Sequence, residues 1–243
     1  MGNLRSVAVS VAALALCAAS LSAQTGTGQV QWKGVNGAWS SFSNSATGPA
    51  QWNVYTSPYR AAFQINEAPS PYLPPAGTST FGPTVDIFCV DFTHYANTGT
   101  YNAYFTNLGT DAADVGITTR THSLTQYLEA AYLAGAYYTN TSAAGDINGA
   151  IWQIMNGEPL YRYNGTSWDA SGINYWVGQA TNNWQSVDAS QWVVVTDQLG
   201  AKNDNTGSQE YLTQVTPEPA TLLLLGTGLL AMIGAATMKR TAV

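Results

Sequence analysis

The chain has 243 residues, of which only 9% are charged, and its formal net charge at pH 7 is −6. Between residues 24 and 215, five basic residues stand against 13 acidic ones and no basic run occurs, which argues against nucleic acid as a partner. All 8 Trp and all 14 Tyr lie in this central segment, so it can bury enough apolar area to fold. Its length fits one domain with a sizeable core.

The N-terminus has the pattern of a secretory signal peptide. A single positive charge precedes an apolar stretch from Val7 to Leu16, and small residues follow it. The stretch is too short to span a membrane, and cleavage is expected between Ala23 and Gln24. Residues 1–23 are therefore predicted to be a signal peptide. The alternative is a lipoprotein signal at Cys17, but a bulky residue precedes it where a small one is needed.

The first half of the exported segment predicts strands. Short runs of strand-preferring residues, separated by turn clusters, cover residues 30–32, 51–55 and 61–65. The strongest strand covers residues 84–92, in which Cys89 shares one face with two other apolar side chains. Residues 101–106 are predicted to pair with this strand as a hairpin across a turn at residues 97–99.

The spacing of apolar residues then changes to that of helices. A capping box at Ser123 and Gln126 predicts a helix that runs to about residue 138. Asp146 is predicted to cap a second helix, which Gly157 ends. A weaker helix is predicted near residues 173–183, before strands at residues 191–196 and 210–215. Strands, helices and strands in this order predict a single, mainly β domain of the α+β class with a helical insert.

The C-terminal segment, residues 216–243, has three parts in a fixed order. Pro217, Glu218 and Pro219 form a break that the interior of a helix or strand does not accommodate. Residues 220–238 carry no charge, and as a helix they would be about 28 Å long, close to the ~30 Å of a bilayer hydrocarbon core. They are predicted to be a transmembrane helix, with Lys239 and Arg240 holding its end on the cytoplasmic side.

This tail resembles the PEP-CTERM sorting signal of envelope and exopolysaccharide-associated proteins of Gram-negative bacteria. The resemblance rests on the Pro-Glu-Pro motif, the apolar run and the basic pair, in that order. It implies that the membrane protease exosortase cuts the tail near the motif and that the protein reaches the cell envelope or the surface. The alternative is a plain C-terminal membrane anchor that is never cut.

Cys89 is the only cysteine that remains after removal of the signal peptide, so it cannot form an internal disulfide. One interpretation is a small apolar residue in a core strand. A second interpretation comes from a resemblance to the thioester domains of bacterial surface proteins, which covers about residues 81–195. The similar stretches are residues 88–91 (FCVD), 127–133 (YLEAAYL) and 150–155 (AIWQIM).

The resemblance to thioester domains implies a β-sandwich or barrel with a helical insert. In that family a strand cysteine and a helix glutamine form an internal thioester, which can capture an amine covalently. The glutamine position is Asn148 in this chain, and its side chain is one methylene shorter. Cys89 and Asn148 are therefore the possible reactive pair, although strand and helix would have to approach more closely than in the family.

Aromatic residues provide another candidate site. Six of them cluster in Gly- and Asn-rich sequence and could stack on sugar rings: Tyr161, Tyr163, Trp168, Tyr175, Trp176 and Trp184. The two histidines, His94 and His122, lack metal-ligand spacing, and neither a metal site nor a cofactor is expected.

No catalytic triad or carboxylate dyad can be named, so a hydrolase is the third-ranked interpretation. The sequence predicts a non-enzymatic, exported surface or matrix protein that exosortase sorts. The alternative is an adhesin that binds exopolysaccharide or another glycan through aromatic residues, or that captures a partner covalently through Cys89.

Overall fold

The computed structural model describes residues 25–49, 51–66, 80–203 and 205–215. The predicted signal peptide and its cleavage point between Ala23 and Gln24 lie outside these residues. So do the Pro-Glu-Pro motif, the predicted transmembrane helix at residues 220–238 and the basic pair after it. Among the helices that the structure describes, none is long and apolar enough to cross a membrane.

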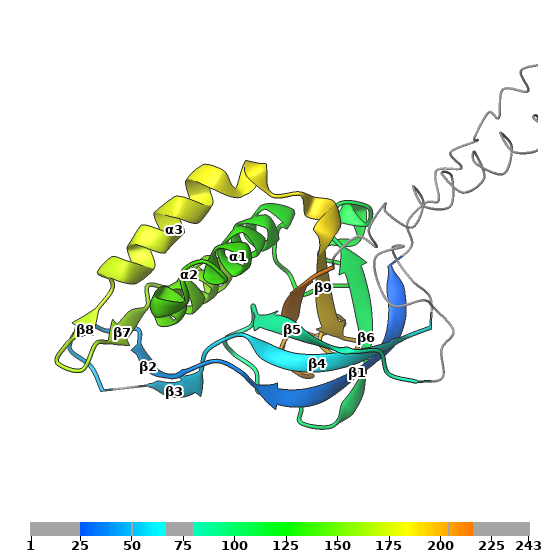
Figure 1. The fold of residues 1–243 in the computed structure, drawn as a ribbon, viewed down its shortest axis with the longest axis horizontal. Helices are drawn as coiled ribbons and strands as arrows, with labels where there is room; N and C mark the ends of the chain where they lie inside the picture. Colours follow the sequence, from blue (N-terminus) through cyan, green and yellow to red (C-terminus); the bar gives the residue numbers. More distant parts are fainter. Residues whose placement is uncertain (1–24, 50, 67–79, 204, 216–243) are drawn as a thin grey trace, which may run out of the picture.

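Six strands form a closed antiparallel barrel, on the right of Figure 1. Around the barrel the strands are β1 (Gly26–Val35), β4 (Tyr59–Ile65), β5 (Thr84–Cys89), β10 (Tyr211–Gln214), β9 (Trp192–Asp197) and β6 (Thr100–Asn107). Side chains alternate between the inside and the outside of such a barrel. Val30 of β1 pairs with Phe63 of β4, and the Phe63 ring packs edge-on against Phe105 of β6 at 5.2 Å. These residues fill the barrel interior.

A second sheet of four antiparallel strands lies beside the barrel, on the left of Figure 1. Its order is β3 (Trp52–Tyr55), β2 (Trp39–Ser43), β7 (Tyr161–Tyr163) and β8 (Trp168–Asp169). The first two strands precede the helices in the sequence and the last two follow the second helix. The sheet therefore joins segments that are far apart in the chain.

Three helices lie together on one side of the second sheet and extend toward the barrel (Figure 1). They are α1 (Leu124–Tyr137), α2 (Ala144–Asn156) and α3 (Ser171–Asn183), with short 3-10 turns at Ala112–Asp114, Thr141–Ala143, Trp184–Ser186 and Ala189–Gln191. Phe88, on the outer face of β5, packs against Tyr137 and Tyr138 at the end of α1. Helix α1 therefore covers part of the barrel wall, and both faces of β5 are buried over its second half, residues 87–89.

Aromatic rings join α2 to the second sheet and to the segment after β5. Trp152 of α2 lies 5.1 Å from Phe42 of β2 and 4.6 Å from Phe92, measured between ring centroids. Trp52 of β3 packs on the other side of Phe92 at 4.5 Å. A Cβ atom on Gly149 would lie only 2.7 Å from the Ile173 side chain, so a larger residue there would push α2 and α3 apart.

The helix predictions are confirmed in position, with one correction at an end. The capping box at Ser123 and Gln126 is present, and Gly157 ends α2 with a left-handed φ of 72°. The prediction that Asp146 caps α2 is wrong, because a 3-10 turn leads directly into the helix at Ala144. The Asp146 carboxylate instead pairs with Arg162 of β7 at 2.7 Å.

The predicted strands occur, but the pairing predicted for the strongest one is wrong. Strand β5 pairs with β4 and β10, whereas β6, its expected hairpin partner, pairs with β1 and β9. Strand β5 also ends at Cys89, three residues before the predicted end. The barrel explains the difference, because its closure places strands from both ends of the domain beside β5 and β6.

Candidate functional site

Cys89 lies at the end of β5 and is completely buried. It stands directly opposite Tyr211 in the pairing of β5 with β10. Its thiol donates a hydrogen bond to the Asp91 carbonyl oxygen at 2.9 Å. Burial raises the pKa of the Cys89 thiol far above its usual range, and the negative charge of Asp91 raises it further. The thiol is therefore protonated in the folded protein at neutral pH.

Asn148 is also buried, on α2 one turn before Trp152. Its Oδ1 accepts a hydrogen bond from the backbone N–H of Ser57, whose Oγ accepts one from the Cys89 N–H at 2.8 Å. Ser57 therefore connects the Asn148 side chain to the backbone of Cys89, and both members of the predicted pair are buried. The Asn148 Nδ2 atom has no hydrogen-bond partner among the residues that the structure describes.

Gln153, the nearest glutamine in the sequence, is turned away from this position. Its side chain donates to Asn174 Oδ1 of α3 at 3.1 Å and accepts from the Leu160 N–H at 2.9 Å. These bonds connect α2 to α3 and to the segment before β7. Asn148 is therefore the amide side chain of α2 that shares a hydrogen-bonded neighbour with Cys89.

A buried cluster of charged groups lies on the other side of Asp91. Arg120 Nε is 2.8 Å from Asp91 Oδ2, and both side chains are almost inaccessible to solvent. Glu210 is fully buried and accepts hydrogen bonds from Tyr127 Oη and Thr196 Oγ1, each at 2.6 Å. The Arg120 backbone N–H also donates to Glu210, at 2.9 Å. Each charged side chain of the cluster is paired or hydrogen-bonded with other residues of the protein, so we interpret the cluster as a structural polar core.

Of the two histidines, His94 belongs to the edge of this cluster. Its Nδ1 atom is 2.7 Å from Asp91 Oδ2. The ring of His122 packs edge-on against Tyr127 at 5.8 Å. Sequence reasoning missed Arg120 and Glu210, although the scarcity of charged residues in the chain could have drawn attention to them.

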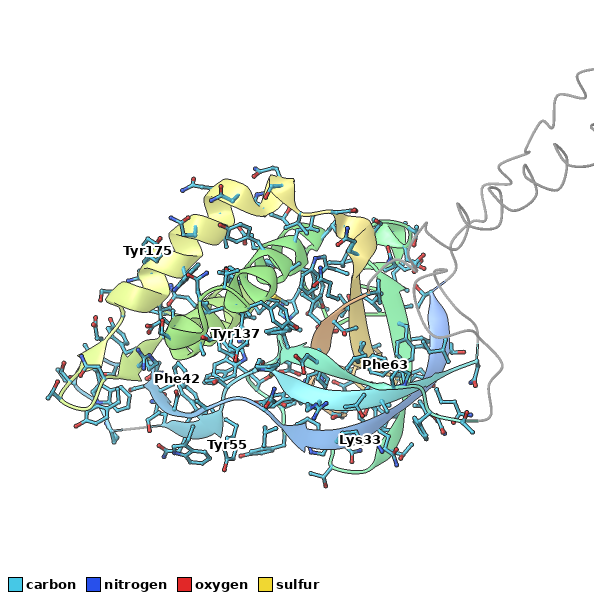
Figure 2. All side chains as sticks on the ribbon, in the orientation of Figure 1. Lys33, Phe42, Tyr55, Phe63, Tyr137 and Tyr175 are labelled. Carbon is cyan, nitrogen blue, oxygen red and sulfur yellow. The ribbon has the colours of Figure 1, made fainter. Side chains whose placement is uncertain are left out.

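The second sheet presents aromatic side chains on the face that points away from the helices. We call this face the outer aromatic face and define it by five residues from its four strands: Trp39, Tyr55, Tyr161, Tyr163 and Trp168. Their exposed fractions reach 58% for Trp39, 46% for Tyr55 and 45% for Tyr163. Figure 2 shows Tyr55 on the side of the sheet opposite to the helices and Phe42 between the sheet and α2.

Strand alternation explains why these residues share a face. Phe42 and Arg162 point inward, because Phe42 packs on Trp152 and Arg162 pairs with Asp146 of α2. Their neighbours in each strand therefore point outward. Pairing places Trp39 beside Tyr55, with ring centroids 4.9 Å apart, and Tyr163 beside Trp168 at 5.4 Å.

The groups between these aromatic pairs are polar and uncharged. Ser41, on the outer side of β2, donates a hydrogen bond to Asn53 Oδ1 of β3 at 2.6 Å. Ser43 lies on the same side of β2 and pairs with Tyr161 of β7, but it is fully buried and therefore not accessible to a ligand. The face thus combines flat apolar rings with hydroxyl and amide groups, and the charge of Arg162 is directed to the other side of the sheet.

The structure divides the aromatic cluster that the sequence predicted. Tyr161, Tyr163 and Trp168 belong to the outer aromatic face, whereas Tyr175 and Trp176 lie on α3 and Trp184 follows that helix, packed against the core. Sequence reasoning missed Trp39 and Tyr55. The two aromatic residues of the Ser-rich run at residues 39–43, Trp39 and Phe42, are the signal that could have suggested β2.

The comparison with protein families finds one match, at the end of the chain. Residues 215–240 match the model described as the PEP-CTERM protein-sorting motif. Neither the curated proteins nor the solved structures contain a match to the chain. The motif confirms the predicted sorting signal and identifies exosortase as the processing enzyme, so the protein is exported to the cell envelope or surface.

Proposed function

We propose that the exported part of this chain is a non-enzymatic surface or matrix protein that binds an uncharged polysaccharide through the outer aromatic face. The observation that carries the proposal is the presence of five Trp and Tyr side chains on one face of one sheet. Tyr and Trp combine a flat apolar ring with a polar atom, which suits the apolar face and hydroxyl groups of a sugar.

The charges of the domain favour an uncharged ligand. Five basic residues against 13 acidic ones give residues 24–215 a net charge of −8. An acidic polysaccharide would be repelled by this excess, and it would find hydroxyl and amide groups rather than cations on the outer aromatic face. Export to the envelope or surface supports the proposal, because a protein there can meet extracellular polysaccharides.

Removal of the two tryptophans should abolish polysaccharide binding at the outer aromatic face. The full-length protein in detergent would be screened on a glycan array, and its affinity for a bound neutral glycan would then be titrated. We expect Trp39→Ala and Trp168→Ala each to weaken binding by about tenfold, because each removes a stacked ring worth up to ~1.5 kcal/mol. The double variant should lose little of its thermal midpoint, since Trp39 is 58% exposed and Trp168 is only half-buried.

Tyr95→Ala is the matched control for this experiment. Tyr95 is 93% exposed and does not belong to the outer aromatic face, so its removal should leave the affinity unchanged. Unchanged affinity of the Trp39→Ala, Trp168→Ala double variant would contradict the proposal. Binding that requires a charged glycan would contradict the choice of ligand.

Covalent capture through Cys89 is the second candidate function, favoured by the Ser57 bridge between Cys89 and Asn148. The Cys89 sulfur would attack the Asn148 side-chain carbonyl carbon, and Nδ2 would leave as ammonia. An amine could then attack the thioester, form an amide with Asn148 and return the thiol to Cys89.

Intact mass and thiol labelling distinguish a free Cys89 from a thioester. A thioester lowers the mass by one ammonia and prevents maleimide labelling even in denaturant. A free thiol gives full mass, no labelling of the native protein because Cys89 is fully buried, and complete labelling in denaturant. Cys89→Ala, which can form no thioester, provides the reference mass.

A further inference from the structure

A groove lies between α1 and α3, away from the outer aromatic face. Its volume is about 670 Å³, which is within the range of small-ligand sites. Helix α1 contributes small residues to one wall, including Gly135 and Ala136, while α3 contributes Tyr175 and Trp176 to the other. Tyr132 of α1 also lines the groove, which is widely open to solvent.

Polar side chains also line the groove: Asp188 and Gln214 are exposed to solvent and Gln191 is half-buried. Gln214, at the end of β10, donates to Gln191 Oε1 at 3.4 Å, and Gln191 donates to Asp188 Oδ2 at 3.0 Å. Asp188 also accepts bonds from the N–H and hydroxyl of Ser190, and these bonds lower the pKa of its carboxyl. These solvent-exposed bonds connect the three side chains in one row, whose remaining donors and acceptors are accessible to a ligand.

The geometry points to this groove as a second binding site, for a single chain of a neutral oligosaccharide. The groove is lined by aromatic rings of α3, by Trp192, and by the amide and carboxylate groups of Gln191, Gln214 and Asp188. A sugar chain can stack its apolar ring faces on the aromatic rings and bond its hydroxyl groups to the amide and carboxylate groups. The groove contains a carboxylate and no Lys or Arg side chain, so an acidic sugar is excluded.

The second site adds a property that the outer aromatic face alone cannot supply. In Figure 2, Tyr175 on α3 and Tyr55 on β3 lie on opposite sides of the molecule. One protein molecule with both sites can therefore connect two polysaccharide chains. This cross-linking role rests on the proposed function, whereas binding in the groove does not.

The experiment separates the two sites by working in the Trp39→Ala, Trp168→Ala background. Neutral gluco-oligosaccharides of several linkages would be titrated into the full-length protein in detergent, with tryptophan fluorescence as the readout, because Trp176 and Trp192 line the groove. We expect binding at one site per chain. Tyr175→Ala should weaken it by about tenfold through loss of one stacked ring, and Ala136→Trp should abolish it by filling the groove.

Both groove variants should keep the wild-type thermal midpoint, since Tyr175 is 58% exposed and residue 136 borders open space. Absence of binding in the Trp39→Ala, Trp168→Ala background, with every oligosaccharide tested, would overturn the inference. Binding that Ala136→Trp leaves unchanged, or binding of peptides but not sugars, would also overturn it. If the wild-type protein binds oligosaccharide in the groove but no polysaccharide at the outer aromatic face, only the cross-linking role is overturned.

Discussion

Replacement of Arg120 by methionine is expected to lower the free energy of unfolding by about 3–5 kcal/mol, because it leaves a buried charge without its partner. Arg120 is 3% exposed and Asp91 2% exposed at a separation of 2.8 Å. The guanidinium also donates through Nη2 to the carbonyl oxygens of Ser208 at 2.8 Å and Thr206 at 3.2 Å. Methionine has a similar length but can replace none of these bonds.

Arg162→Met is the matched control in the same urea-unfolding experiment. Arg162 also pairs with an aspartate, Asp146, at 2.7 Å, but the two side chains are 29% and 19% exposed. Water can replace that interaction, so we expect a loss of no more than about 1 kcal/mol. Equal losses for the two variants would contradict the conclusion that burial makes the Arg120 pair essential to stability.

Local sequence patterns were sufficient to predict most of the helices and strands. The capping box at Ser123, the left-handed glycine after α2 and the apolar residues of β5 each act within a few positions, so the sequence alone identifies them. Strand pairing is different because it depends on closure of the barrel, where β10 from the end of the domain lies beside β5. The wrong hairpin prediction has this cause.

The candidate sites were predictable only in part for the same reason. The composition of residues 161–176 indicated an aromatic surface, but only the order β3-β2-β7-β8 brings Trp39 and Tyr55 to the same face as Tyr163 and Trp168. The groove beside Tyr175 depends on how α1 packs against α3. Strands β2, β7 and β8 have only five, three and two residues, so their local signals are weak, and their aromatic side chains share a face only in the assembled sheet.

The buried Glu210 should make stability fall as pH rises from about 4.5 to about 7. Burial raises the pKa of Glu210 to about 7 from its ordinary value of 4.5, although bonds from Thr196, Tyr127 and the Arg120 N–H favour the charged form. The negative charge of Asp91 adds to the rise. Between these two pH values the folded protein retains a proton that the unfolded chain has released, so higher pH favours unfolding.

Glu210→Gln isolates this contribution, because glutamine keeps an acceptor oxygen and remains neutral at every pH. Urea unfolding of both proteins from about pH 4.5 to about pH 8 would give the difference in stability, in which the other titrating groups cancel. The shift in pKa corresponds to about 3 kcal/mol, gained by the variant relative to wild type across this window. Glu158→Gln is the control at an exposed position, and its free energy of unfolding should depend on pH in the same way as that of wild type. The opposite result would be a free energy of unfolding that rises with pH in wild type relative to Glu210→Gln. It would mean that Arg120 and the hydrogen-bond donors outweigh burial, so that the folded protein favours the charged carboxylate.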